Sequence, residues 1–354
     1  MSATITKERE SSYELIRIIA QFFIVFYHIF SVYIYNITDQ PLHRAIWLPL
    51  HIGVILFVLI SGYFGIKSSV RGFVKLIGMM IVLYIPIDLI NLLLTNGLQT
   101  WGGKKHFLTY LFTVSASPFW FMRTYVFLYL LAPLINLYLS KANLARRIYI
   151  VCALGFISHW VGALGQDPSL YDGKNAVTFL FLYSLGDTLR VYRNQLARIR
   201  PLYYGLAFLL YNTALVTLYS FWTGRLAMIT YNRMFFAYCS FGLLVSSVLF
   251  FLWIGNLKFK SRFINLIGPS SMTIYMIHGS NLIIFSIVPH IVDHILASNP
   301  SNLLLFSEVF VVTFIIVTFC ISLDILLRPV WRWLNRLGLR LEERITATTA
   351  KWAA

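Results

Sequence analysis

Long apolar stretches separated by short polar segments follow one another along most of the chain. Each stretch has about 20 residues, the length of an α-helix that crosses the hydrocarbon core of a bilayer. A soluble core of this size would show short amphipathic elements instead. The pattern predicts an all-α polytopic membrane protein with about ten transmembrane helices, at 13–35, 45–66, 74–95, 118–139, 147–164, 175–191, 202–221, 234–254, 264–289 and 304–327. A shorter stretch at 104–114 predicts an interfacial helix.

Composition agrees with this pattern. Hydrophobic residues make up 58% of the 354 residues, and charged residues only 12%, about half the usual share of a soluble domain. The net charge of +16 is compatible with nucleic-acid binding, but the charges lie in short loops between apolar stretches. That placement is typical of membrane topology, and we expect no nucleic-acid partner. Without a long linker or polar domain, residues 1–354 are predicted to form one membrane domain.

The distribution of Lys and Arg predicts the orientation. With a cytoplasmic N-terminus and ten spans, inner loops and tails hold 21 of the 29 basic residues, and outer loops hold 6. Arg17 and Arg123 fall within spans. Because cytoplasmic loops are enriched in Lys and Arg, both termini are predicted to be cytoplasmic. The basic tail at 328–354 is either an amphipathic helix along the inner leaflet or a plain positive anchor.

The first span holds three ionisable residues, Glu14, Arg17 and His28. Such groups are costly in a membrane and are functional candidates. Arg17 and His28 are eleven residues apart, which on a helix is about 20° from full turns and roughly 16 Å of rise. They therefore share a face, with Glu14 one turn before Arg17 and able to pair with it. A deep neutral His can take a proton from a hydroxyl, or it can simply hydrogen-bond a neighbouring helix.

Several phrases in the chain together resemble the acyltransferase-3 family of membrane O-acyltransferases. Arg17 and His28 match its Arg-x10-His signature, and the sequence LFVLISGY at 56–63 resembles its second-span phrase. The stretch RGFVK at 71–75 is similar to its cytoplasmic arginine motif, although Lys75 stands where Arg is more usual. The phrases FWF at 119–121 and GPSSMTIYMIH at 268–278 resemble later family phrases, in the expected order.

The resemblance implies an acyl donor, usually acetyl-CoA, that enters from the cytoplasm, and a sugar hydroxyl as acceptor at the outer side. It implies that His28 is the general base or acyl-handling residue and that Arg17 supports the donor or orients the site, with Glu14 as the third candidate catalytic residue. Arg71, Lys75 and Lys67 form a cytoplasmic cluster suited to CoA phosphates. The same cluster is also what ordinary positive-inside charge would produce.

Four further residues are candidates for substrate contact or support. Tyr275 and His278 lie one turn apart and form either a structural pair or part of the site. Arg123 follows Trp120 by one turn near the outer end of its span and meets a lipid phosphate or sugar, or simply snorkels.

The sequence as a whole predicts an inner-membrane (plasma-membrane) O-acetyltransferase that acts on a surface polysaccharide or its lipid-linked precursor. Acetyl-CoA is the expected donor, no metal spacing is present, and membrane lipids and polysaccharide-assembly proteins are the expected partners. A transporter or flippase is the main alternative, because intramembrane Arg, Glu and His also line proton and substrate pathways. A non-catalytic subunit of a polysaccharide assembly complex is the second alternative.

Overall fold

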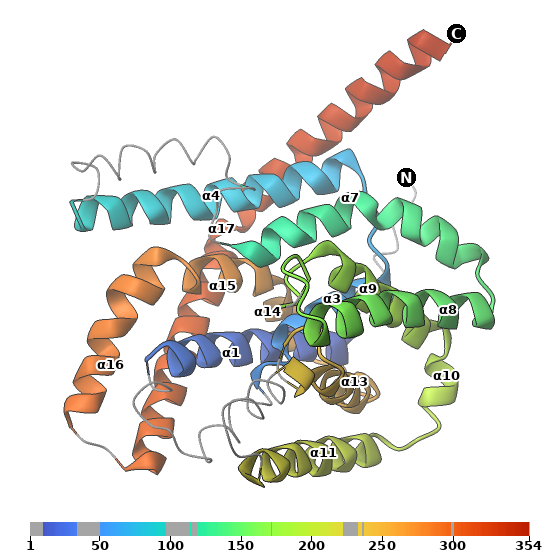
Figure 1. Cartoon of the computed structure of the whole chain (residues 1–354). Helices are drawn as coiled ribbons and strands as arrows, with labels where there is room; N and C mark the ends of the chain where they lie inside the picture. Colours follow the sequence, from blue (N-terminus) through green and yellow to red (C-terminus); the bar gives the residue numbers. More distant parts are fainter. Residues whose placement is uncertain are drawn as a thin grey trace.

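The structure, a computed structural model, describes residues 10–33, 50–96, 114, 119–170, 172–221, 233–235, 237–298 and 301–353 (Figure 1). Every regular element in these ranges is helical, as predicted. The predicted helix at 104–114 lies outside the described residues except for Val114. The helices are α1 (Ser11–Tyr33), α3 (Gly53–Phe64), α4 (Val70–Leu94), α7 (Trp120–Lys141), α8 (Leu144–Gly155), η3 (Phe156–Leu164), α9 (Ala176–Val191), α10 (Arg193–Leu196), α11 (Pro201–Phe221), α13 (Phe241–Gly255), α14 (Arg262–Ile267), η4 (Gly268–Ser270), α15 (Ser271–His278), η5 (Leu282–Ile287), α16 (Val288–Ala297) and α17 (Asn302–Ala353).

Each of the ten predicted ranges overlaps a helical segment. Six of the described helical segments are long and apolar enough to cross a membrane. The helices at Arg262–His278 and Leu282–Ala297 together make a seventh candidate, bent by 58°. The helices α3 and α13 are apolar but shorter, and α9 has 16 residues. The chain is thus a multi-helix membrane protein, and the count of ten spans stays a prediction.

Side-chain caps fix where several helices begin. Ser69, Asn143, Asn175, Ser240 and Ser261 each accept a hydrogen bond from the backbone N–H three residues later. These caps satisfy N–H groups that a helix start leaves without a backbone partner. The short polar segments between the apolar stretches therefore set the helix starts.

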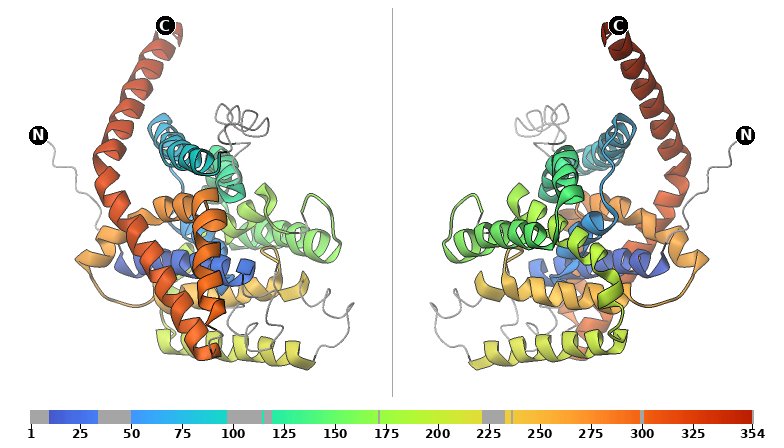
Figure 2. Two further views of the ribbon diagram at one scale, coloured as in Figure 1. Left: turned by 90° about the vertical axis from the view of Figure 1, so that its left-hand side faces the viewer. Right: turned by 90° about the vertical axis from the view of Figure 1, so that its right-hand side faces the viewer.

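Two buried apolar clusters make up the interior, and α1 contributes to both. The first half of α1 packs with α3, α7, α9 and α13, and its second half packs with α4, α15, α16 and α17. Figures 1 and 2 show α1 inside the bundle, crossed by the other helices. The face of α1 that bears Arg17 and His28 thus opens into the protein interior.

Close packing of α3 on α9 depends on two glycines. A Cβ atom on Gly62 would lie 2.0 Å from the carbonyl oxygen of Tyr183, and one on Gly186 would lie 2.3 Å from that of Leu59. Small residues let two membrane helices approach until their backbones touch. The SG pair at 61–62 therefore serves packing through its glycine.

The last helix, α17, runs without a break from Asn302 to Ala353 and ends well outside the bundle (Figure 2). Its basic part begins inside the protein, because Trp331 and Leu334 are buried. The side chain of Arg328 donates to the carbonyl oxygen of Leu266 at 2.7 Å. The first turns of the predicted tail therefore pack against the bundle, and only later turns extend away from it.

We expect Gly62→Ala to destabilise the protein by about 1–3 kcal/mol, because the new methyl group would overlap the backbone of α9. Thermal unfolding of the purified protein in detergent measures this loss. Gly255→Ala is the matched control, because the atoms nearest to its methyl group belong to the Tyr13 side chain, at 3.2 Å or more, and not to a helix backbone. Equal melting temperatures for the Gly62 variant and the wild type would contradict the packing argument.

Candidate active site

Two histidines from opposite ends of the chain meet in the interior. His28 of α1 and His278, the last residue of α15, stack with ring centroids 5.2 Å apart. The His28 Nδ1 and His278 Nε2 atoms are 3.0 Å apart, within hydrogen-bond distance. His278 is almost completely buried, whereas His28 is partly exposed to a cavity. The partner of His278 is thus His28, and not Tyr275 alone.

A backbone carbonyl determines the tautomers of the two neutral rings. His278 Nδ1 lies 2.6 Å from the carbonyl oxygen of Ile274, which can only accept a hydrogen bond. Nδ1 of His278 therefore carries the hydrogen, and its Nε2 accepts from Nδ1–H of His28. Nε2 of His28 is left with a lone pair. His28 is in this way oriented as a base by a second imidazole.

Arg17 is held in the second turn of α1. Its Nη1 atom lies 2.5 Å from Oε1 of Glu14, in the predicted ion pair. A Cβ atom on Gly268 would lie 2.3 Å from the other Glu14 carboxylate oxygen, so glycine leaves room for this buried acid. The Arg17 guanidinium carbon lies 5.8 Å from the centre of the Phe64 ring. Arg17 therefore has a fixed position next to a cavity.

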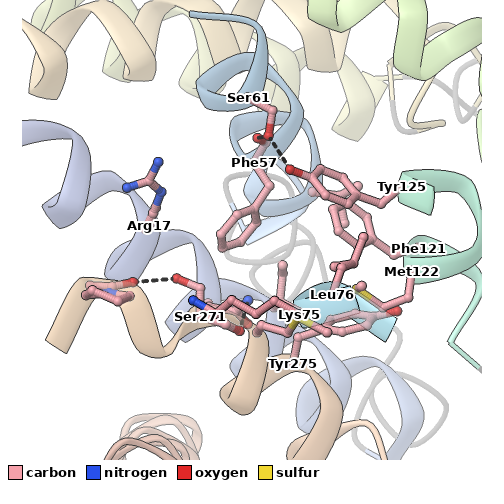
Figure 3. A pocket seen from close by; sticks show the side chains of 16 residues that line it. Arg17, Phe57, Ser61, Lys75, Leu76, Phe121, Met122, Tyr125, Ser271 and Tyr275 are labelled. Carbon is pink, nitrogen blue, oxygen red and sulfur yellow. Dashed lines mark hydrogen bonds between the residues drawn. The ribbon is translucent and has the colours of Figure 1, made fainter. Parts of the chain in front are cut away.

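The first cavity, here called the arginine cavity, has a volume of about 390 Å³. In Figure 3, Arg17 lies on one side and the rings of Phe121 and Tyr125 lie on the other, with Phe57 between them and Lys75 and Tyr275 below. The Tyr125 hydroxyl lies 3.3 Å from Oγ of Ser61. This cavity combines two cations with aromatic and hydroxyl groups.

The second cavity, here called the histidine cavity, has a volume of about 290 Å³ and is lined by His28. Ile24, Val54 and Tyr275 line both cavities and so lie between them. Along α1, Arg17 and Ile24 face the first cavity, and Ile24 and His28 face the second. The face predicted from helical spacing thus connects a cationic cavity to an imidazole.

The three cations of the predicted cytoplasmic cluster do not line the same cavity. Lys75 lines the arginine cavity, whereas Lys67 lines a separate cavity beyond α3. The Nε of Arg71 donates to Oδ1 of Asn335 in α17 at 2.6 Å. The structure therefore joins Lys75 with Arg17, and not with Lys67, in one cavity.

Aromatic side chains form a wall of the histidine cavity. Trp120 and Tyr238 have ring centroids 5.4 Å apart, and those of Tyr238 and His51 are 4.7 Å apart. All three line the cavity. Lys174 lies over the Trp120 ring, with Nζ 5.5 Å from the ring centre. Trp120, a predicted candidate, thus lines this cavity together with His51 and Tyr238, which the sequence did not place there. The Arg123 side chain is exposed on α7 and lines neither cavity.

A buried carboxylate positions α15. Asp324 of α17 accepts hydrogen bonds from Ser270 Oγ at 2.9 Å and from Thr273 Oγ1 at 2.5 Å. It also accepts one from Trp331 Nε1, at 3.1 Å. These bonds fix the segment that ends at His278. The Ser and Thr residues of the 268–278 phrase therefore attach α15 to α17.

A family model described as an acyltransferase domain, that of the acyltransferase-3 family, matches residues 10–325. The chain belongs to the acyltransferase-3 family. No curated protein matches the chain, and no solved structure does. The match covers both histidines, Arg17 and the two cavities, so the activity of this family member is to be sought there. Among the residues that the structure describes, no cluster of three His, Cys, Asp or Glu side chains suits a metal ion.

The histidine pair predicts a graded effect of substitution at position 278 on acyl transfer. His278→Ala removes the acceptor for His28 Nδ1–H, and we expect the rate of acyl transfer to fall about 100-fold. His278→Gln keeps a side-chain acceptor and should restore part of the rate. The comparison is made on kcat and KM of the purified acyltransferase, over a range of pH.

A role in packing alone makes a different prediction. It would lower the stability of both His278 variants while leaving the pH dependence of kcat unchanged. An Ala variant with the wild-type kcat and pH profile would contradict the positioning of His28 by His278.

Proposed function

We propose that this acyltransferase moves an acetyl group from cytoplasmic acetyl-CoA to a hydroxyl of a surface polysaccharide or its lipid-linked precursor. The proposal rests above all on His28, which lies between a partner that orients it and a cavity that can hold an acceptor. The cationic cavity on the same face of α1 supports an anionic donor, because Arg and Lys pair well with phosphates.

The proposed topology has ten spans in the plasma membrane with both termini in the cytoplasm. The excess of Lys and Arg in the predicted inner loops supports it. In this orientation, the start of α1 and the first turn of α4 are near the cytoplasm, where Arg17 and Lys75 meet the donor. His28 lies further along the same face of α1 and is nearer the outer side.

In the proposed reaction, Nε2 of His28 takes the proton of the acceptor hydroxyl while the oxygen attacks the thioester carbonyl carbon. A C–O bond forms, the C–S bond breaks, and the CoA thiolate leaves. The proton on Nε2 of His28 then passes to the thiolate sulfur, which gives free CoA thiol and restores the neutral imidazole. Nδ1–H of His28 stays bonded to His278 throughout, which stabilises the transient imidazolium.

A second route uses the same lone pair as a nucleophile. Nε2 of His28 first attacks the thioester carbonyl carbon, so that the C–S bond breaks, the CoA thiolate leaves and His28 carries the acetyl group. The acceptor oxygen then attacks the acetyl carbon, the N–C bond breaks, and the hydroxyl proton passes to the freed Nε2 and on to the thiolate. The tautomer inferred from these contacts supports both routes, since each needs a free Nε2 electron pair. Rapid quenching with radiolabelled acetyl-CoA in the absence of acceptor separates them, because only the second route leaves label on the protein.

The aromatic wall supports a carbohydrate acceptor. Trp120 and Tyr238 offer ring faces beside His28, and aromatic side chains combine a large apolar face with a polar edge. A sugar ring has an apolar face of C–H groups and a rim of hydroxyls, so it can stack on the wall and present one hydroxyl to His28.

We expect His28→Ala to lower the rate of acetyl transfer by about 10²–10⁴-fold, the usual contribution of a general base. The assay uses sealed vesicles with acetyl-CoA on the cytoplasmic side and the polysaccharide on the other. His290→Ala is the matched control, because His290 lines a different cavity. If the His28 variant acetylates the polymer at the wild-type rate, the mechanism is wrong.

We expect Lys75→Gln to raise KM for acetyl-CoA about tenfold, because it removes a charged contact in the arginine cavity. Arg71→Gln should have a smaller effect, since the Arg71 Nε already binds Asn335. Steady-state kinetics with both variants at one ionic strength makes the comparison. A larger KM change for Arg71 than for Lys75 would place the donor phosphates outside the arginine cavity.

A further inference from the structure

A third cavity, here called the basic cavity, lies where several helices end together. It has a volume of about 410 Å³. Its walls come from the last residues of α3, α7 and α9 and from the start of α8. Four cations line it, Lys67, Arg147, Arg190 and Arg193, together with the two acids Glu10 and Asp187. These cations come from separate parts of the chain, and only the fold brings them together.

Two of the four cations are held in place by Asp187. Its Oδ2 pairs with Arg147 and its Oδ1 with Arg190. Arg147 is buried and donates also to the carbonyl oxygens of Leu139, at 2.5 Å, and Ala142, at 3.2 Å. Arg147 and Asp187 thus form a satisfied, rigid base of the cavity. Arg190 keeps an exposed side chain at its edge.

The other two cations are not neutralised by close contacts. Within the described part of the chain, no carboxylate oxygen lies within 4.0 Å of the Lys67 or Arg193 side chain. Both residues are exposed at the cavity. Even with Glu10 counted, four positive charges face two negative ones. Such a hollow attracts an anion, and charges of one sign in a concave site reinforce one another.

The position of the basic cavity limits which anion can reach it. Phe64 lines this cavity and also lies against Arg17 of the arginine cavity. In the proposed topology both cavities open near the cytoplasm, where anionic lipid headgroups and CoA are present. The anionic group that these sources share is a phosphate ester, and Arg and Lys are its usual partners.

We propose that the basic cavity binds a phosphate ester through Lys67 and Arg193, with Arg190 at its edge and the Arg147–Asp187 pair as a fixed base. The phosphate belongs either to an anionic phospholipid headgroup or to the nucleotide end of CoA. Only the second source rests on the proposed function. In that case the donor spans two cavities, with the 3′-phosphate of its nucleotide end beyond Phe64 and its diphosphate and thioester arm in the arginine cavity.

The test compares two double variants of the full chain that lose the same charge. Lys67→Gln with Arg193→Gln alters the basic cavity, and Arg146→Gln with Arg198→Gln removes two exposed cations that do not line it. Each protein is measured for binding of CoA and of CoA without its 3′-phosphate. Each is also measured for retention of phosphatidylglycerol against phosphatidylcholine by native mass spectrometry.

We expect the first double variant alone to lose about tenfold in affinity for one probe. Loss of the preference for CoA over its dephosphorylated form identifies the nucleotide end. Loss of phosphatidylglycerol retention identifies the lipid. The charge-conserving pair Lys67→Arg with Arg193→Lys should keep either preference, which separates charge from folding. If the two double variants show the same preference for CoA over its dephosphorylated form and the same retention of phosphatidylglycerol, the site is refuted.

The wild type separates failure of this proposal from failure of the proposed function. A wild-type protein that binds no CoA but retains phosphatidylglycerol through Lys67 and Arg193 would refute the CoA-dependent reaction and keep the phosphate site. A wild-type protein that binds CoA, and in which neither CoA binding nor phosphatidylglycerol retention depends on these two residues, would refute the phosphate site and keep the CoA-dependent reaction.

Discussion

Polar groups inside the helical bundle of a membrane protein must find their hydrogen-bond partners within the protein. This constraint determines how the interior of this chain is arranged. His28 meets it by bonding His278, which in turn bonds the Ile274 carbonyl. Asp324 meets it with hydroxyl donors of the 268–278 segment. Because these bonds join α1, α15 and α17, each group that orients the histidine pair also holds the helices together.

The same constraint applies to the boundary that the arginine cavity shares with the histidine cavity. Of the three described residues that line both cavities, Ile24 and Val54 are apolar and Tyr275 has a polar side chain. A charged CoA head has no partners along such a boundary, whereas a neutral thioester arm needs few. In the proposed reaction the boundary therefore separates the part of the donor that stays on the cationic side from the part that reaches His28.

Periodicity within one helix was enough to predict part of the site. The shared face of Arg17 and His28 and the pairing of Glu14 with Arg17 follow from positions in a single helix, and both appear in the structure. The helical class and the overlap of each predicted range with a helix follow from apolar length. The partner of His28 was out of reach, because it is 250 residues away and its position depends on how α15 packs. His51 and Tyr238 were missed for the same reason, since each lies in a different predicted span from His28 and the periodicity of one helix does not show its contacts with another.

The three predicted cytoplasmic cations show the limit of arguments from charge placement. Lys67 and Lys75 are eight residues apart and look equivalent in a count of positive-inside charges. The turn between α3 and α4 separates them, so that Lys75 faces the arginine cavity and Lys67 faces the cavity on the other side of Phe64. Topology counts measure on which side of the membrane a charge lies, not which cavity it lines. Side-chain packing decides the second question, and in this protein it assigns neighbouring cations of one short segment to different sites.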